Sequence, residues 1–77
     1  MKTAVFRVEF SDHVSQRRMD GIVVLLEAYG MVAGGTSERV FTIALFRESK
    51  LRQLKSLLTR LERGGSICWS EHGQNSN

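Results

Sequence analysis

The chain of 77 residues has no proline, one cysteine and no long apolar run. A lone cysteine cannot close a disulfide within the chain, which indicates a reducing compartment such as the cytoplasm. Near the start, the apolar residues stop at Phe6 because Arg7 follows, whereas a signal peptide needs about 7–15 of them. The longest apolar run, Ile22–Leu26, is far short of the roughly 20 residues that span a membrane. We therefore expect a cytoplasmic protein with neither a leader nor a membrane helix.

Aromatic and metal-ligating residues are also scarce. Apart from Phe46 at the end of one strand, the predicted strands carry no aromatic side chain on their outer face, so the stacking platform of an RNA-recognition motif is not expected. Cys68 and the two histidines lack the spacing of a zinc site. We expect Cys68 to be a small buried residue rather than a nucleophile, because no histidine lies near it in the sequence.

The basic residues are concentrated in one segment. The chain has 11 Lys and Arg against 8 Asp and Glu, a net charge of +3. Between Arg47 and Arg63 there are six bases and two acids, which gives +4, whereas the rest of the chain has five bases and six acids, which gives −1. A basic excess on one predicted helix is typical of a surface that meets phosphates.

The period of the apolar pattern predicts the secondary structure. Residues 4–10 and 39–46 alternate in polarity, which indicates strands with one buried face. Residues 15–29 and 49–63 have helical spacing, with Asp12 or Ser15 available to cap the first helix and Ser49 to cap the second. Residues 31–33 and 66–69 are short strand candidates, and 34–37 are a predicted turn. A strand over 22–28 remains the alternative to the first helix, because Gly21 is followed by three β-branched residues, Ile22, Val23 and Val24.

The resulting order is β-α-β-β-α-β. Two right-handed crossovers place both helices on one face of a four-stranded antiparallel sheet. The predicted fold is therefore α+β, a ferredoxin-like two-layer sandwich formed by residues 1–70 as one domain, with 71–77 as a polar, disordered tail. A domain of this size buries little more than about 60% of its unfolded surface, so a second subunit would add stability.

The face of the sheet that the helices leave open is the expected dimer interface. Its residues are small and mildly apolar, which suits packing against a second copy. The alternative is a solvated face with a few scattered apolar residues. The predicted interface residues are Val5, Arg7, Val40, Thr42 and Ala44.

Two groups of polar residues are candidates for function. In the second helix, Arg52, Lys55, Arg60 and Arg63 lie off the leucine stripe and can meet phosphates, or form an ordinary solvated face. At the end of the first strand, Asp12 can hold Mg²⁺ with its symmetry mate for phosphodiester cleavage, or simply cap the helix. Two bases that follow Asp12 would hold the substrate backbone: Arg17 and Arg18.

The sequence from Asp12 through Arg17 and Arg18 to the segment Leu26–Gly30 resembles a known family. A first strand that ends in aspartate, two bases that open the helix and a closing leucine-x-x-tyrosine-glycine pattern are similar to the small CRISPR-associated endonucleases of the adaptation machinery, with their VapD-type toxin and ribonuclease-antitoxin relatives. The resemblance covers roughly residues 3–30. It implies a homodimer, a shared Mg²⁺ site at Asp12 and an RNA or DNA substrate.

We therefore expect a small dimeric protein that binds RNA or DNA, with metal-dependent endonuclease activity as the catalytic hypothesis. The alternative is a non-enzymatic interaction module, a small regulator or inhibitor of the kind that mobile elements encode. Such a module would dock its basic helix on an acidic protein. A regulatory domain of the amino-acid-sensing type shares the strand order, but residues 10–14 lack the glycine that such domains usually carry after their first strand.

Overall fold

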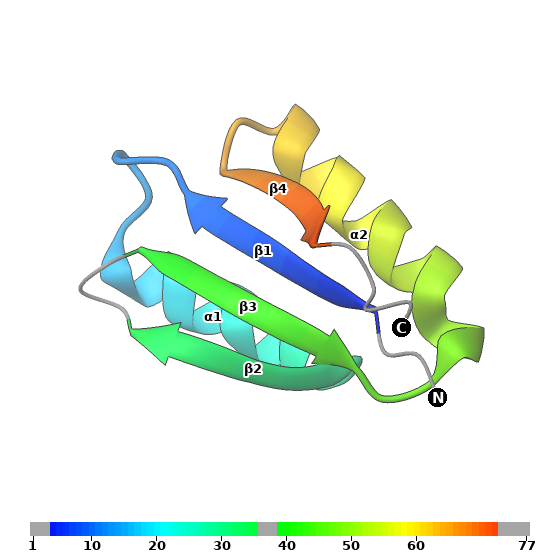
Figure 1. Ribbon diagram of the computed structural model, residues 1–77. Helices are drawn as coiled ribbons and strands as arrows, with labels where there is room; N and C mark the ends of the chain where they lie inside the picture. The colour runs from blue at the N-terminus through cyan, green and yellow to red at the C-terminus, as the bar shows by residue number, and fades with distance from the viewer. Residues whose placement is uncertain (1–3, 36–38, 73–77) are drawn as a thin grey trace.

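The computed structural model of the chain describes residues 4–35 and 39–72. The helices and strands follow one another in the predicted order (Figure 1). They are β1 Val5–Phe10, α1 Gln16–Glu27, β2 Gly30–Gly35, β3 Val40–Leu45, a 3₁₀ turn Glu48–Lys50, α2 Leu51–Arg63 and β4 Ile67–His72.

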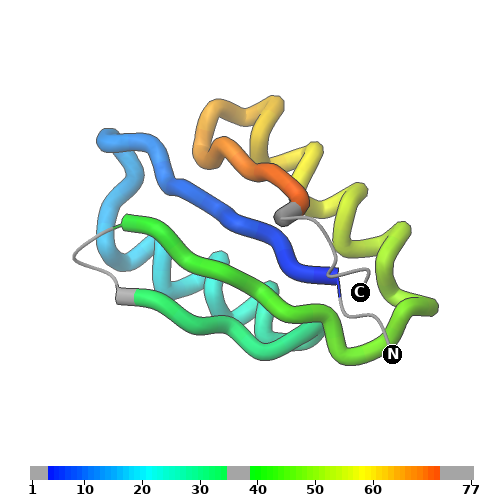
Figure 2. Tube along the Cα trace, in the orientation of Figure 1, coloured from blue at the N-terminus to red at the C-terminus, as the bar shows by residue number. Residues whose placement is uncertain are grey.

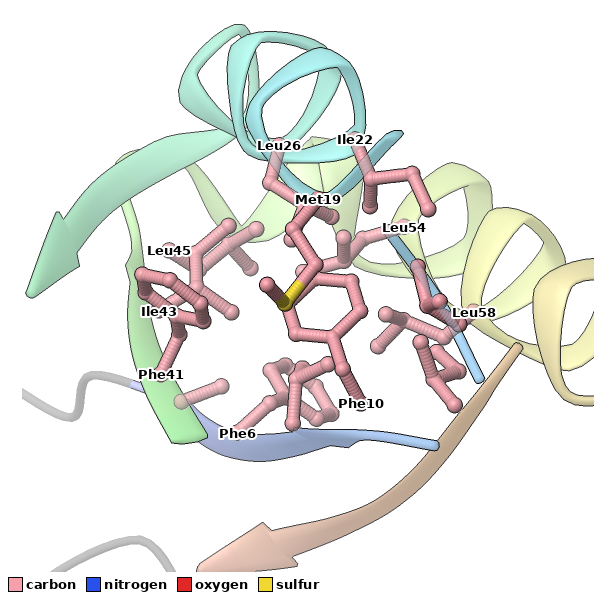
Figure 3. Close-up of a cluster of buried hydrophobic side chains, with 14 residues drawn as sticks. Phe6, Phe10, Met19, Ile22, Leu26, Phe41, Ile43, Leu45, Leu54 and Leu58 are labelled. Atoms are coloured by element: carbon pink, nitrogen blue, oxygen red, sulfur yellow. The ribbon is translucent and has the colours of Figure 1, made fainter. Parts of the chain in front are cut away.

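The four strands form one sheet in the order β2-β3-β1-β4, and every neighbouring pair is antiparallel. Both helices cover the same face of this sheet, so the molecule has two layers (Figures 1 and 3). The ferredoxin-like fold expected from the sequence is confirmed.

The core lies between the sheet and the two helices (Figure 3). The alternation in β1 buries Phe6, Val8 and Phe10, while Arg7 and Glu9 stay exposed. The rings of Phe10 and Phe41 pack edge to face with their centroids 5.3 Å apart, and those of Phe6 and Trp69 lie 5.8 Å apart. Strands β3 and β4 add Ile43, Leu45 and Ile67 to the core. The helices contribute five further large buried side chains: Met19, Ile22, Leu26, Leu54 and Leu58.

Residues 22–27 are helical, so the strand alternative for 22–28 is wrong. Met19, Ile22 and Leu26 lie on one face of α1 and are buried, and this helical spacing outweighs the β-branched composition. Ser15 caps the helix, because its Oγ accepts a hydrogen bond from the Arg18 backbone N–H at 3.2 Å. Asp12 does not act as the cap.

The predicted cap of the second helix and the predicted turn over 34–37 are corrected. Ser49 lies inside the 3₁₀ turn, and Lys50 precedes α2 without a side-chain capping bond. Gly34 and Gly35 belong to β2, which pairs with β3 as far as Gly35 opposite Val40, rather than to a turn. Residues 36 and 37 of that predicted turn lie outside the described residues.

The last correction concerns the predicted polar tail. Strand β4 continues to His72, because β1 offers pairing positions along its full length, from Phe10 opposite Ile67 to Val5 opposite His72. Residues 71 and 72 are therefore strand, and 73–77 lie outside the described residues.

Candidate functional site

The bases of α2 share one flank of the helix. Leu54 and Leu58 are fully buried against the sheet, which turns the polar positions outward. We call Arg52, Lys55, Arg60 and Arg63 the basic flank. An open hollow of about 630 Å³ runs along it, and no acidic side chain lines this hollow. The lining residues are Leu51, Arg52, Lys55, Ser56, Thr59, Arg60 and Arg63.

An ion pair connects Lys55 of the basic flank to β4. Lys55 Nζ lies 3.3 Å from Glu71 Oε1, and Glu71 is on the last strand. Within the described residues β4 pairs only with β1, so it is an edge strand. Lys55, one of the four bases of the flank, therefore lies beside this edge strand, and α2 runs next to β4 in the ribbon (Figure 1).

The loops after β1 and after α2 are bonded to each other at one end of the sheet (Figure 2). The Ser11 backbone N–H donates to the Ser66 carbonyl at 2.9 Å, and Ser11 Oγ donates to the Gly65 carbonyl at 2.8 Å. The Arg18 guanidinium donates to Ser66 Oγ at 3.3 Å. These bonds connect the start of α1 to the end of α2.

The side chain of Arg39 also stabilises the loop after β1, at the same end of the sheet. Arg39 was not among the residues predicted from the sequence. One of its terminal nitrogens donates to the carbonyls of Ser11 at 2.7 Å, of Asp12 at 3.2 Å and of Val14. Arg39 adopts the left-handed backbone conformation, with φ of 58°, just before β3. Nothing in its local sequence signals bonds to residues 25–28 positions away.

The predicted catalytic group is only partly assembled. Asp12 is exposed in the turn after β1, and among the described residues its carboxylate makes no hydrogen bond or ion pair. Arg17 is exposed on α1, whereas Arg18 is bonded to Ser66. No hydrogen bond or ion pair joins the Asp12 carboxylate to either arginine side chain in the described part of the chain.

A magnesium site at Asp12 lacks further ligands within one copy. Mg²⁺ prefers several oxygen ligands in near-octahedral geometry, with one or two carboxylates completed by water and substrate phosphates. In residues 4–35 and 39–72, no three His, Cys, Asp or Glu side chains gather where they could hold a metal ion. The predicted role of Asp12 as a metal ligand therefore depends on a second copy or a bound phosphate.

The predicted dimer residues lie together on the open face of the sheet. Met31 pairs with Ala44, which pairs with Val5, so these three form one row across the strands. Thr42 and Arg7 form the next row. The placement agrees with the sequence analysis, and the role of the face as an interface stays a prediction.

This face holds charged and strongly exposed residues as well. Arg7 Nη1 lies 3.5 Å from Glu9 Oε1 on the same strand. Met31 is 66% exposed and Phe46, just after β3, is 62% exposed. Cys68 is exposed, opposite Glu9 on β4, so the expectation that it is buried is wrong. Its neighbours Ile67 and Trp69 face the helices, and alternation turns Cys68 away from them.

An exposed apolar face on α1 was not anticipated. Val24 is 65% exposed and Leu25 is 53% exposed, although both lie in the middle of a regular helix. Gly21 and Ala28 are on the same outer side, one turn before and one turn after them. We call Gly21, Val24, Leu25 and Ala28 the outer face of α1. The only sequence signal was the unbroken apolar run from residue 22 to 26.

No protein-family model, curated protein or solved structure matches the chain. In the described part of the chain, neither helix has the length and apolar character needed to cross a membrane.

Proposed function

We propose that the protein binds nucleic acid through the basic flank of α2. The observation that carries this proposal is the lining of the hollow, which contains four bases and no acid. A phosphate backbone is the polyanion that such a surface fits, because each neutralised phosphate releases counterions and adds to the affinity. From Arg52 to Arg63 the flank extends about 16 Å along the helix axis, at about 1.5 Å per residue.

The lining favours contact with the backbone rather than with the bases. The hollow contains no aromatic side chain on which a base could stack, and two hydroxyl groups, from Ser56 and Thr59, can add hydrogen bonds to phosphate. Binding through this surface would therefore depend strongly on salt and only weakly on sequence. Two copies in the expected homodimer would present two such flanks and increase the apparent affinity.

The catalytic hypothesis stays a prediction. Metal-dependent cleavage would need Asp12 together with further ligands from a second copy or a bound phosphate. The alternative function, docking on an acidic protein surface, would use the same four bases.

The test is a titration of fluorescent duplex DNA, duplex RNA and single-stranded RNA against the protein at several salt concentrations. Contacts from all four bases, with Lys55 exchanging its ion pair with Glu71 for a phosphate, predict a slope of log affinity against log salt of about −3.6 for duplex DNA. The double variant Arg52→Gln/Arg60→Gln should reduce this slope by about 2. The matched control Arg7→Gln/Arg47→Gln removes the same charge outside the hollow and should leave the slope unchanged.

Absence of binding to all three probes at low salt would overturn the proposal and favour the acidic protein partner. The same samples, incubated with Mg²⁺, test catalysis. Cleavage that disappears in Asp12→Ala would support the catalytic hypothesis, and cleavage equal in both proteins would assign it to a contaminant.

A further inference from the structure

The outer face of α1 is apolar where a surface helix normally presents polar residues. A helix that covers a sheet has one apolar stripe toward the core and a polar stripe toward solvent. In this protein α2 follows that rule, since its exposed positions are all charged or polar, whereas α1 exposes Val24 and Leu25. Because both helices belong to the same layer, the difference is a property of α1 and not of the architecture.

Gly21 has no explanation within one copy. A glycine in the interior of a helix costs about 1 kcal/mol relative to alanine. A Cβ placed on Gly21 would meet no atom within 4 Å, so the monomer does not need the missing side chain. A glycine without a Cβ does, however, allow a second helix to approach the backbone closely.

We infer that a second copy of the chain covers the outer face of α1, with the two helices antiparallel around a two-fold axis. This inference deepens the dimer part of the proposed function and replaces the open sheet face as the interface. With the axis between residues 22 and 23, Gly21 of one copy lies level with Val24 of the other. Val24 and Leu25 of each copy then pack over the Gly21 backbone of the other.

The charges at the ends of α1 complement each other in this arrangement. Arg17 is exposed in the first turn and Glu27 in the last. Antiparallel pairing brings Arg17 of each copy level with the last turn of the other, within reach of Glu27. Antiparallel helix dipoles are also favourable. A parallel pairing would place Arg17 next to Arg17, so the charge pattern selects the antiparallel one.

The open face of the sheet is the less favourable of the two candidate dimer interfaces. Its central charges, Arg7 and Glu9, already pair within one strand at 3.5 Å. The two surfaces lie on opposite layers of the molecule, and two self-complementary contacts on opposite sides would build an open chain of subunits rather than a closed dimer. A closed dimer therefore uses one of the two surfaces, and the exposed apolar residues and end charges favour the outer face of α1.

Sedimentation velocity over a wide range of protein concentration tests this inference. One helix pair buries less than the roughly 1,200–2,000 Å² of a standard interface, so the dimer should dissociate on dilution. The wild-type mass should rise from 8.7 kDa toward twice that value with concentration. Val24→Glu should stay monomeric, and Met31→Glu, a change at an equally exposed position on the open face, should behave as wild type.

Gly21→Ala separates loss of association from loss of folding. Alanine favours the helix, so the monomer should melt at a higher temperature, while the added methyl groups weaken the dimer at least tenfold. A wild-type protein that stays monomeric at every concentration overturns the inference. A dimer that is lost in Met31→Glu but kept in Val24→Glu also overturns it and assigns the open sheet face.

Failure of the dimer and failure of nucleic-acid binding are distinguishable with the same proteins. If only the dimer is absent, the salt slope of binding per chain remains and Val24→Glu binds as wild type does. If only the basic flank is unused, Arg52→Gln/Arg60→Gln leaves sedimentation unchanged and no protein binds the probes.

Discussion

The Arg18 guanidinium donates a hydrogen bond to Ser66 Oγ at 3.3 Å and thereby joins the first turn of α1 to the residue that follows the α2 loop. Ser66 is 4% exposed, which makes it the buried polar residue of this end of the molecule. Arg17, the neighbouring arginine, is exposed and makes no such bond. Two adjacent bases that look equivalent in the sequence therefore have different roles.

Replacing these two arginines by alanine should affect stability differently. Arg18→Ala removes the donor to a buried hydroxyl and should lower the free energy of unfolding by about 1 kcal/mol. Arg17→Ala is a surface change and should stay within about 0.5 kcal/mol of wild type. Urea unfolding followed by circular dichroism measures both. Equal effects of the two substitutions would contradict the structural role of the Arg18–Ser66 bond.

Arg39 allows its side-chain bonds and its backbone conformation to be tested separately. Arg39→Ala loses the bonds to the β1–α1 loop and keeps a side chain in the left-handed conformation, so unfolding should be easier by about 2–3 kcal/mol. Arg39→Gly loses the same bonds but relieves the backbone, and should recover about 1 kcal/mol of that loss. Thermal melts of the pair give the difference. If glycine proves no better than alanine, the left-handed backbone carries no cost at this position.

Gly30 is required for the approach of β2 to β3. A Cβ at Gly30 would lie 2.2 Å from the Ala44 carbonyl oxygen, a backbone atom that cannot move aside cheaply. Gly30→Ala should therefore destabilise the protein by about 2–3 kcal/mol or more. The matched change Gly64→Ala meets only carbonyls at 3.6 and 3.7 Å and should alter stability by less than about 0.5 kcal/mol. Chemical unfolding of both variants decides the matter, and a mild effect at Gly30 would contradict the close strand approach.

The strands and helices that bury one face and expose the other could be predicted from the sequence. Phe6, Val8 and Phe10 alternate with polar residues because β1 has one buried face, and Leu54 and Leu58 repeat with the helical period because α2 has one buried stripe. Burial of one face imposes a period on the residues, and a period is visible without coordinates. The fold followed from those periods and from the handedness of crossovers.

The features that the sequence did not reveal have no periodic signal. The glycines of β2 lack side chains, so the strand extends beyond the apolar residues that mark it. Cys68 lies in the strand candidate 66–69, which is too short for its alternation to decide between a buried Cys68 and one on the open face of the sheet. The bonds of Arg39 join residues far apart in the chain, and only the folded backbone brings their carbonyls together.

The two candidate sites also differ in whether a periodic pattern in the sequence marks them. The basic flank follows from composition and helical period, so its residues were predicted and lie together. The predicted metal site at Asp12 required the Asp12 of a second copy to lie close by, and a single chain does not contain that residue. Antiparallel pairing of α1, a helix about 18 Å long by its 12 residues, would place the two Asp12 side chains beyond opposite ends of the helix pair, and one metal ion would not reach both.

The position of β1 in the sheet has a consequence for the order in which the chain folds. β1 lies between β3 and β4, so the earliest strand in the sequence obtains its second neighbour only from the last strand. Contacts between segments so distant in sequence make folding slow relative to helical proteins of similar length. During synthesis on the ribosome, β1 has an unpaired edge until residues 67–72 emerge, and the growing chain is exposed to aggregation through that strand until then.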